Sequence, residues 1–379
     1  MAEILFYTSL FLIFYGYFGY PLSLLFVSLL KSNNKRVINP DYYPYVTLII
    51  TAYNEEKRIE KKIENTISLN YPKHKLQIIV ASDGSTDKTN DIVKRYNDYG
   101  IELLEIAERR GKENAQKEAV KKATGEVIVF TDVATYLEPN ALKQIVSNFA
   151  DPSIGCVSSE DRLLGKNGKP GGEGFYVRYE MWLRRLESKV NSLVGLSGSF
   201  FAARKEVCQD FSGEMQSDFR TVLSSLKMGM KGVSDPKSIG YYQDVSDEEK
   251  EFTRKVRTVL RGLTVFFNHL EFLNFLKYGF FSYQYLCHKL LRWLVPVFLF
   301  IAFVSNFILA WKSYIFLGLF LAQMVFYIWA FLGWKIKNLI KGGLLKIPVY
   351  FLIVNASIFV AWWKYLKGER VIMWTPSER

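Results

Sequence analysis

Tyr45–Ala52 reads YVTLIITA, and Gln77–Ser82, the next stretch of the same kind, reads QIIVAS. Both are short, rich in β-branched residues and apolar on both faces, as expected for strands buried inside a parallel sheet. Between them, Glu56–Leu69 has isoleucines at helical spacing, at positions 59, 63 and 67, and is predicted to be a helix. This part of the chain therefore predicts a strand–helix–strand unit.

The same alternation continues downstream. Asp87–Tyr99 is predicted to be a second helix, stopped by Gly100 in the position favoured for a left-handed cap. The predicted elements that follow are a third strand at Ile101–Ile106, a third helix at Glu113–Ala123 closed by Gly125, and a fourth strand at Val127–Thr131. Strands and helices that alternate with short links predict an α/β fold with a mainly parallel sheet and right-handed crossovers.

Ligands bind such sheets beyond the carboxyl ends of the strands, which here are followed by residues 53–55, 83–85 and 132–135. Asp83 could accept hydrogen bonds from a nucleoside's base or ribose, and Gly84 lets the backbone turn tightly. The alternative for Asp83 is a helix-capping turn, because Ser85 and Asp87 are good capping residues. Asp132 could reach a ribose or a metal-bound diphosphate, or could be a turn residue.

The pattern is looser beyond Ala150. Composition predicts a flexible loop at Gly165–Gly174 (GKNGKPGGEG). Further predicted elements are a helix at Phe175–Leu193, a strand at Gly198–Arg204 and a helix at Asp218–Met228 with Gly229 beyond it. Asp218 begins its helix, so it is either a functional acid or an N-cap. Glu249–Leu276 mixes apolar and basic residues at roughly helical spacing, which suits an amphipathic helix in a membrane interface.

Apolar, almost uncharged stretches lie at both ends of the chain. Each is close to the ~20 residues that a bilayer-spanning helix requires. They are Ile4–Leu30, Leu290–Ala310, Tyr314–Leu332 and Pro348–Trp363. The first is too long and too aromatic for a cleaved signal and is not followed by a small-residue cleavage site, so we interpret it as a retained anchor.

The chain has a formal net charge of +12. Basic residues follow the first span at Lys31, Lys35 and Arg36, and the third at Lys335, Lys337, Lys341 and Lys346. The positive-inside rule then predicts that both groups, and the polar domain, are cytoplasmic. The remaining basic excess could serve anionic lipid or a phosphorylated substrate.

The tail conflicts with a simple topology. A chain that starts outside and crosses the membrane four times would end outside. The tail, however, carries the basic residues Lys364, Lys367, Arg370 and Arg379, which the positive-inside rule places inside. Either the last segment re-enters the membrane or an extra pass lies within Gly262–Leu286.

Several classes of function are disfavoured. The basic clusters lie beside apolar spans, which argues against nucleic acid as a partner. Cys156, Cys208 and Cys287 share no motif spacing and would stay reduced in a cytoplasmic domain, and the three histidines lie too far apart to suggest a metal cluster. A Rossmann-type dehydrogenase is disfavoured because no Gly-x-Gly-x-x-Gly follows the first strand.

The motifs, taken together, closely resemble family 2 glycosyltransferases. They are Pro44–Glu56 (PYVTLIITAYNEE), Ile78–Asp87 (IIVASDGSTD), Arg110–Ala115 (RGKENA), Gly125–Asp132 (GEVIVFTD) and Gly198–Arg204 (GSFFAAR). The resemblance extends from Tyr45 to Gly262 and is more specific in its first half. The flanking anchor, interface helices and spans resemble the membrane-bound, polysaccharide-synthesising bacterial branch of that family.

The resemblance implies a GT-A fold, which agrees with the alternation of strands and helices. The implied domains are an N-terminal anchor at residues 1–31, a GT-A domain at 40–245, amphipathic interface helices at 246–288, and transmembrane helices with a tail at 289–379. The implied activity is inverting transfer of a sugar from a nucleotide-diphosphate donor, for which we expect a UDP-sugar. The acceptor would be a polysaccharide or a lipid-linked molecule at the cytoplasmic membrane face.

The resemblance also assigns roles to residues. Asp218, in Gln216–Phe219 (QSDF), resembles the catalytic acid of the family and would remove the proton of the acceptor hydroxyl. Gly198 and Ser199 would let the backbone approach the donor sugar, although Gly198 could equally be an ordinary strand glycine. The full set of expected donor-binding residues is Ala52, Tyr53, Glu55, Asp83, Gly84, Lys112, Asp132, Gly198, Ser199, Arg254, Arg257 and Arg261.

One departure from the family concerns the metal. The family usually has Asp-x-Asp after the fourth strand, and its second acid binds Mn or Mg. This chain has Asp132-Val133-Ala134, so the second acid is missing. We still expect Mg or Mn, held by Asp132 together with donor phosphates and water, because Mg readily keeps several waters.

A second departure concerns the acceptor. Processive members usually carry Gln-x-x-Arg-Trp, but this chain has Glu251-Phe252-Thr253-Arg254-Lys255. Loss of the Trp removes a stacking platform and weakens the expectation of long-chain processivity. Arg254, Arg257 and Arg261 share one helix face, and the forked guanidinium suits a diphosphate. The alternative is a basic face over anionic lipid.

Two rival functions remain open. A non-processive enzyme could glycosylate a membrane lipid, such as a polyprenyl phosphate or a ceramide-like acceptor. A non-catalytic membrane protein could instead bind nucleotide sugars as a sensor, although the retained Asp83, Asp132 and Asp218 argue against it. The donor sugar, the linkage and the oligomeric state are not encoded in any motif.

Overall fold

The structure is a computed structural model that describes residues 1–31, 36–164, 175–243, 248–336, 346–371 and 373. The loop predicted at 165–174, and Lys35, Lys337, Lys341 and Arg379, lie outside the described residues. The chain divides into two compact units, one made of residues 1–23 with 245–371 and the other of 24–244 with 372–379. Each unit is described by itself.

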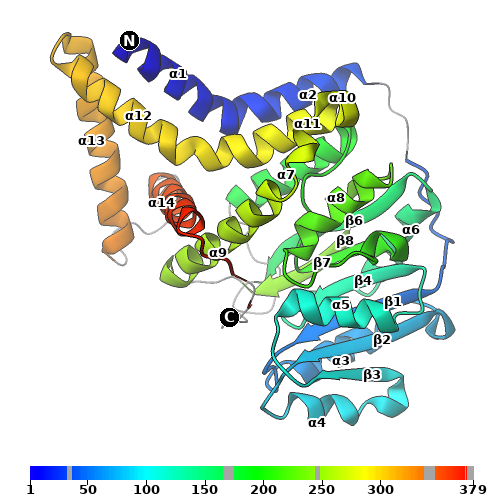
Figure 1. Cartoon of the computed structure of the whole chain (residues 1–379). Helices are drawn as coiled ribbons and strands as arrows, with labels where there is room; N and C mark the ends of the chain where they lie inside the picture. Colours follow the sequence, from blue (N-terminus) through cyan, green and yellow to red (C-terminus); the bar gives the residue numbers. More distant parts are fainter. Residues whose placement is uncertain (32–35, 165–174, 244–247, 337–345, 372, 374–379) are drawn as a thin grey trace. The chain divides into compact units, whose positions relative to one another are not determined.

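Within the described residues, the second unit is built on an eight-stranded sheet with the order β3-β2-β1-β4-β7-β6-β8-β5 (Figure 1). The strands are β1 (Val46–Ala52), β2 (Leu76–Asp83), β3 (Ile101–Ile106), β4 (Val127–Asp132), β5 (Thr135–Leu137), β6 (Ile154–Leu164), β7 (Phe200–Arg204) and β8 (Lys231–Gln243). Strands β3, β2, β1 and β4 run parallel. Strand β7 is antiparallel to β4 and β6, and β5 is antiparallel to β8, so the sheet is mixed.

The four strands predicted from Tyr45 to Thr131 are confirmed as β1 to β4, to within one residue at each end. All residues of β1 are buried, because helices cover both faces of the sheet. Residues alternate between those faces. Leu48 and Ile50, for example, belong to one core together with Ile59 and Ile63 of α3 (Ile59–Ile67).

Helices α3, α4 (Thr89–Lys94) and α6 (Ala141–Ser147) contribute to that core. Helix α5 (Lys112–Lys122) packs on β1 and β2. Helices α7 (Phe175–Val190) and α8 (Ser217–Lys227) pack against β6 and β8. The resulting arrangement of helices around a central sheet is the α/β architecture that the sequence predicts.

Several predicted helices are shorter than expected, among them the first two of the sheet unit and the one predicted at Phe175–Leu193, which ends at Val190. Helix α3 begins at Ile59 because residues 54–58 form a turn, and α4 ends at Lys94 before a short 3₁₀ helix at Asn97–Tyr99. Gly100 has φ +78°, which confirms its left-handed position.

Gly125 does not cap α5, contrary to the prediction. A Cβ atom at this position would lie 2.4 Å from the backbone nitrogen of Thr47. Glycine is needed here because the backbone passes directly over β1. The helix itself ends at Lys122, before an extended Ala123.

The second half contains elements that the sequence analysis missed, namely α6, β5, β6 and β8. Strand β8 includes Asp235, Pro236 and Gly240, residues that are depleted in strands. It is stabilised by parallel pairing with the long strand β6, where the register shifts around Ser158. Such pairing between distant segments overrides local propensity.

The first unit consists of helices. The first is a continuous helix at Ala2–Leu30, made of α1 (Ala2–Phe14), a π-helical stretch at Tyr15–Gly19 and α2 (Tyr20–Leu30), whose last residues belong to the other unit. The others are α9 (Glu248–Phe267), α10 (Phe275–Tyr278), α11 (Phe280–Tyr285), α12 (Arg292–Ala310), α13 (Tyr314–Lys335) and α14 (Ile347–Leu366). Helix α1 packs on α12, α12 on α13, and α14 on both α13 and α9.

Among the described residues, four helices are long and apolar enough to cross a membrane, at Ala2–Leu30, Phe280–Ala310, Tyr314–Lys335 and Ile347–Leu366. The predicted span at 290–310 therefore begins earlier, because α11 and a π-helical stretch at Leu286–Leu291 continue into α12. The amphipathic helix predicted at 249–276 ends at Phe267, before a 3₁₀ helix at Leu270–Leu273 and α10.

Candidate functional site

The strand register brings three predicted site segments to one edge of the sheet. Strands β1, β2 and β4 end at Ala52, Asp83 and Asp132. In the ladders, Ala52 pairs with Ser82 and Thr51 pairs with Asp132, so the three carboxyl ends are level. Because β7 is antiparallel, it begins at this same edge, where Phe200 pairs with Thr131. The residues just before β7 therefore join the edge.

The turn after β1 is locked to the turn after β2. Asn54 has φ +50°, a left-handed conformation that asparagine tolerates better than most residues. Its backbone N–H donates to Ser85 Oγ (3.1 Å), and Thr86 N–H donates to Asn54 Oδ1 (2.8 Å). Next to it, the ring of Tyr53 lies 3.8 Å from the Arg109 guanidinium. An aromatic ring stacked on a cation is thus present at the edge.

Glu55 already has a partner inside the protein. Its buried carboxylate accepts two hydrogen bonds from Arg58, at 2.7 and 2.8 Å. Burial raises the pKa of Glu55, the bond from Arg58 opposes this rise, and the nearby charge of Asp132 adds to it. Of the residues expected to bind the donor, Glu55 therefore has a clear structural role in holding the start of α3.

Asp83 holds the loop that leads into α5. Its two carboxylate oxygens accept hydrogen bonds from the backbone N–H groups of Arg110 (2.9 Å) and Gly111 (2.7 Å). Asp83 is only 3% exposed, although each carboxylate oxygen can accept a further bond. Gly84 has φ +66°, and a Cβ there would lie 2.7 Å from the Arg109 backbone nitrogen, so glycine is required. A contact of Asp83 with a nucleoside stays a prediction.

Lys112 joins two parts of the edge. It is the first residue of α5, and its Nζ donates to the carboxylate of Asp132 and to the carbonyl oxygen of Gly198 (2.9 Å). The backbone N–H of Asp132 in turn donates to the carbonyl of Ser199 (3.0 Å). A positive charge is therefore fixed beside Asp132 and the turn before β7.

Asp218 lies against this turn. A Cβ atom at Gly198 would be 2.7 Å from Asp218 Oδ2, so any side chain at position 198 would displace the Asp218 carboxylate. The partly exposed Asp218 carboxylate accepts hydrogen bonds from Phe219 N–H (2.9 Å) and Gln216 Nε2 (3.2 Å). The N-cap of α8 is Gln216, so the alternative role of Asp218 as the N-cap is not what the structure shows.

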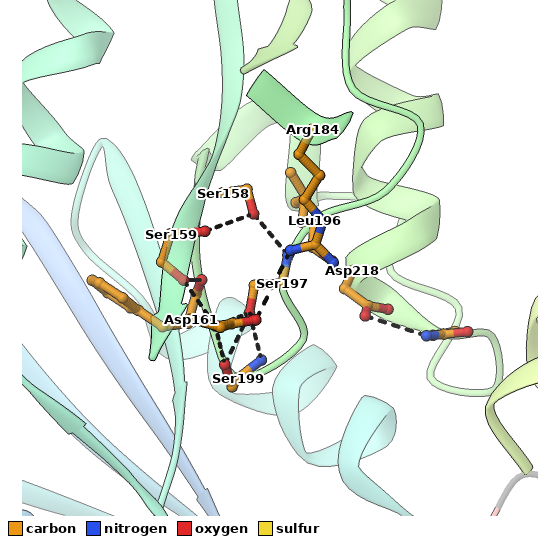
Figure 2. Close-up of polar contacts among 10 residues, drawn as sticks. Ser158, Ser159, Asp161, Arg184, Leu196, Ser197, Ser199 and Asp218 are labelled. Carbon is orange, nitrogen blue, oxygen red and sulfur yellow. Dashed lines mark hydrogen bonds and ion pairs between the residues drawn. The ribbon is translucent and has the colours of Figure 1, made fainter. Parts of the chain in front are cut away.

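The turn itself is held by a polar cluster that the sequence analysis missed, formed by Asp161, Ser197 and Ser199 (Figure 2). Ser197 Oγ lies 2.6 and 2.7 Å from the two carboxylate oxygens of Asp161, and Ser199 Oγ lies 2.9 Å from one of them. Asp161 is on β6, far from these serines in sequence. The cluster forms only because β6 pairs with β7, so the sequence alone does not predict it.

The three arginines lie on α9, in the other unit. Arg254 forms a two-pronged ion pair with Glu251, at 2.7 and 2.8 Å. Arg257 and Arg261 are half-buried. The opposite face of α9 is apolar, with Val256, Leu260 and Leu263 buried. The predicted amphipathic character of this helix is present, and its contact with a donor stays a prediction.

Comparison with known proteins shows which family the sheet unit matches. Residues 47–211 match the sequence model of glycosyl transferase family 2. The chain carries a family 2 glycosyltransferase domain. The match covers β1 to β7 with Asp83, Lys112, Asp132 and Gly198, and confirms the enzyme class that the motifs predict. Asp218 and α9 lie beyond the matched residues.

The relatives share one name. Poly-beta-1,6-N-acetyl-D-glucosamine synthase of Staphylococcus aureus is 28% identical over 208 residues, which is 53% of this chain and 49% of that protein. The protein of the same name from Staphylococcus epidermidis is 25% identical over 169 residues, covering 44% of this chain and 40% of the relative. The chain thus spans about half the length of the curated relatives it matches.

One solved structure resembles nearly the whole chain. The mannosyltransferase PcManGT from Pyrobaculum calidifontis, in complex with GDP-Man and Mn²⁺, has a TM-score of 0.76 and 22% identity over 98% of this chain and 100% of that one. At this identity the likeness shows the fold. It confirms the GT-A fold of the family 2 domain.

The metal-binding capacity of the family 2 domain is limited. Among the residues that the structure describes, no group of three or more His, Cys, Asp and Glu side chains could hold a metal ion. Asp132 offers a carboxylate, and position 134 is alanine. This donor set fits Mg or Mn when the remaining ligands are donor phosphates and water, an arrangement that Mg commonly adopts.

Lys62 is another residue that the sequence analysis missed. It is fully buried, and its Nζ donates to Thr131 Oγ1 (2.9 Å) and to the carbonyl of Thr135 (2.5 Å). Burial lowers the pKa of Lys62 from 10.5 to about 7, against the opposing attraction of Asp132. The sequence could have indicated its burial. Lys62 lies three residues after Ile59, and residues at this spacing share one face of a helix, here the apolar face of α3.

Proposed function

We propose that this chain is an inverting glycosyltransferase, which moves a sugar from a nucleotide-diphosphate donor onto a polysaccharide or lipid-linked acceptor at the cytoplasmic face of a membrane. The observation that carries the proposal is the convergence at one sheet edge of Lys112, Asp132, Gly198 and Asp218. The family match and the apolar helices support the same activity.

Asp218 is the proposed base. Inverting transfer in one displacement needs a group that removes the proton of the acceptor hydroxyl as the new bond forms. The Asp218 carboxylate is partly exposed and accepts rather than donates its hydrogen bonds, as a base should. Gly198 lies directly against this carboxylate and places no side chain beside it.

The leaving nucleoside diphosphate gains negative charge during the reaction, which fixed positive groups can stabilise. Lys112 is buried at the edge in a suitable position. We propose that Arg254, Arg257 and Arg261 add to this charge through forked contacts. The rest of the proposed donor site is Ala52, Tyr53, Asp83, Gly84 and Ser199.

A divalent ion, Mg or Mn, completes the proposal. Asp132 would hold it together with the donor phosphates, and the ion would supply charge stabilisation to the departing diphosphate. Mn²⁺ is present in the complex of the mannosyltransferase that shares this fold, which supports a divalent ion here.

The acceptor distinguishes two versions of the proposal. The name of the curated relatives supports a polysaccharide acceptor. The replacement of the family's Trp by Lys255 favours a non-processive enzyme that glycosylates a membrane lipid. Lys255 forms an ion pair with Glu251 (3.2 Å) and lies 4.9 Å from the ring of Tyr350, so it presents no stacking surface of its own.

The test of the activity uses the full chain in nanodiscs with native membrane lipid and radiolabelled UDP-N-acetylglucosamine or GDP-mannose. We expect Asp218→Asn to keep donor affinity within a few-fold and to reduce transfer by about a hundredfold or more, because the base is lost. The matched control is Asp210→Asn, an exposed carboxylate earlier in the same segment, which should leave transfer unchanged.

The outcomes separate catalysis from folding. If donor affinity in Asp218→Asn falls as far as transfer, Asp218 is a structural residue and the proposed base is wrong. If the wild-type chain neither hydrolyses nor transfers any sugar while it binds donor, a non-catalytic sensor is favoured instead.

A further inference from the structure

The turn formed by Ser197, Gly198 and Ser199 contacts three of the charged residues on which the proposed reaction depends, namely Lys112, Asp132 and Asp218. The carbonyl of Gly198 accepts a hydrogen bond from Lys112, and the carbonyl of Ser199 accepts one from the backbone of Asp132. Gly198 also lies against the Asp218 carboxylate. A small displacement of this turn would therefore move all three groups at once.

The backbone ladder between β6 and β7 does not extend to this turn. The ladder between β6 and β7 reaches Ser158 and Phe201, and the turn lies beyond it. Side chains of β6 continue the contact. Ser197 N–H donates to Ser158 Oγ (2.8 Å), and Ser159 Oγ donates to the carbonyl of Phe200 (2.6 Å). Figure 2 shows these bonds beside the Asp161 cluster.

Asp161 makes the strongest of these contacts. An ionised carboxylate only accepts hydrogen bonds, and bonds to a charged group are roughly twice as strong as neutral ones. Asp161 accepts from Ser197 and Ser199, whose hydroxyls are also 2.9 Å from each other. Its side chain is 15% exposed, and the Arg184 guanidinium lies 3.9 Å away. Arg184 in turn reaches the carbonyl of Leu196, at 3.5 Å, just before the turn.

We propose that Asp161 is a positioning residue for sugar transfer. The turn contacts Lys112, Asp132 and Asp218 at the same time only in one conformation. The Asp161 carboxylate holds the turn in that conformation. The proposal rests on the proposed glycosyltransferase activity and adds to it a residue that touches none of the reacting groups. Asp161 acts through the two serines on either side of Gly198.

The substitution Asp161→Asn is suited to a test because it keeps the shape of the side chain. Asparagine has a single oxygen acceptor, and its NH₂ group donates. At least one serine bond must then be lost or reversed, and the negative charge facing Arg184 disappears. The fold should survive, because the β6–β7 ladder and the bonds of Ser158 and Ser159 are untouched.

The experiment measures kcat and the donor KM of the full chain in nanodiscs, with the radiolabelled donor that the wild type turns over. We expect Asp161→Asn to lower kcat by about tenfold or more, because misplacement of about 1 Å can cost a hundredfold in rate. The donor KM should stay within a few-fold. Hydrogen exchange of the amides of residues 196–199 should become faster.

A double substitution tests the route of action. If Asp161 acts through Ser197, then Ser197→Ala combined with Asp161→Asn should lose no more activity than Asp161→Asn alone. The control is Asp151→Asn, which makes the same change of charge at a carboxylate that accepts hydrogen bonds from Ser153 N–H (3.0 Å) and Ser153 Oγ (2.7 Å) in the turn before β6. It should keep wild-type kcat.

The outcomes are distinct. Wild-type kcat in Asp161→Asn, or losses that add in the double variant, would overturn the positioning role. A fall in kcat that is fully matched by unfolding at the assay temperature would also overturn it, because the role would then be structural. A wild-type chain without transfer activity would instead count against the proposed function.

Discussion

Lys62 shows how a buried charge can support the sheet edge at a cost in stability. Burial of an ammonium group is unfavourable, and the pKa of Lys62 falls to about 7 as a result. The amine nevertheless ties α3 to Thr131 and Thr135, on either side of Asp132. Burial of the Lys62 charge therefore lowers the stability of the fold, while its hydrogen bonds fix the turn after β4.

This gives a prediction for pH. The folded pKa of Lys62 is below its ordinary value of 10.5, so between these values the unfolded chain binds more protons and stability rises with pH. Below pH 7 the full cost of burying the charge is present. We expect Lys62→Met to remove that cost, so its stability relative to wild type should be greatest near pH 6 and decline towards pH 9.

Thermal unfolding of both full-length proteins in detergent, followed by intrinsic fluorescence at several pH values, measures this difference. The slope can be at most about 1.4 kcal/mol per pH unit for one proton. A difference between variant and wild type that does not change with pH would contradict this expectation, because it would show that Lys62 remains charged in the folded protein throughout this range.

Helix α9 combines two properties that allow different functions. Its apolar face is buried, and its other face carries Arg254, Arg257 and Arg261. The ion pair between Arg254 and Glu251 orients one guanidinium along the helix and partly neutralises it. A diphosphate contact and a lipid contact make different demands on these arginines, so the helix can be tested as an element.

We expect Arg254→Lys and Arg257→Lys to lower turnover strongly, with the larger loss at Arg257, which is nearer the middle of α9. A lysine is a point charge and cannot make the forked contact with a diphosphate. If the arginines only rest on anionic lipid, each contributes about 1 kcal/mol and lysine should replace it fully.

Turnover is compared in neutral and anionic nanodiscs, with Arg95→Lys as a control. Arg95 is an exposed arginine of the sheet unit, 3.7 Å from Glu60. Near-native rates for both α9 variants in either lipid would exclude the diphosphate contact.

The helical unit as a whole is built for an apolar surrounding. Helix α13 exposes most of its apolar side chains, whereas polar groups pair between helices. The amides of Asn306 and Gln323 are hydrogen-bonded at 3.1 Å between α12 and α13, and Trp362 Nε1 donates to the carbonyl of Trp293 (2.9 Å) between α14 and α12. Such bonds hold helices together where the surrounding lipid offers none.

At the scale of the whole chain we expect short products, with one sugar added to each acceptor lipid. Lys255 follows Arg254 where the family resemblance predicts Trp for a processive enzyme, and the described residues include four helices long and apolar enough to cross a membrane. Mass spectrometry of the lipid-extracted products, after long incubation with excess donor, measures their size. A ladder of long polymers would contradict the expectation and favour the polysaccharide version.

Much of the first half of the fold could be predicted from the sequence. Strands β1 to β4 are short runs of β-branched residues buried on both faces, and this composition is itself the signal. Because parallel strands bring their carboxyl ends to one edge, the positions of Asp83 and Asp132 followed from the order of the elements. Gly84 and Gly100 were also predictable, since a positive φ demands glycine locally.

The rest was decided by the tertiary structure. Strands β6 and β8 form because they pair with each other over a large separation in sequence, despite poor local propensity. Asp161 reaches Ser197, Lys62 reaches Thr135, and Gly125 passes over Thr47 only after the sheet has assembled. The spacing of apolar residues along a helix or strand indicates which of its faces is buried. The partner of a polar side chain depends on which distant segment packs beside it, and no local pattern contains that information.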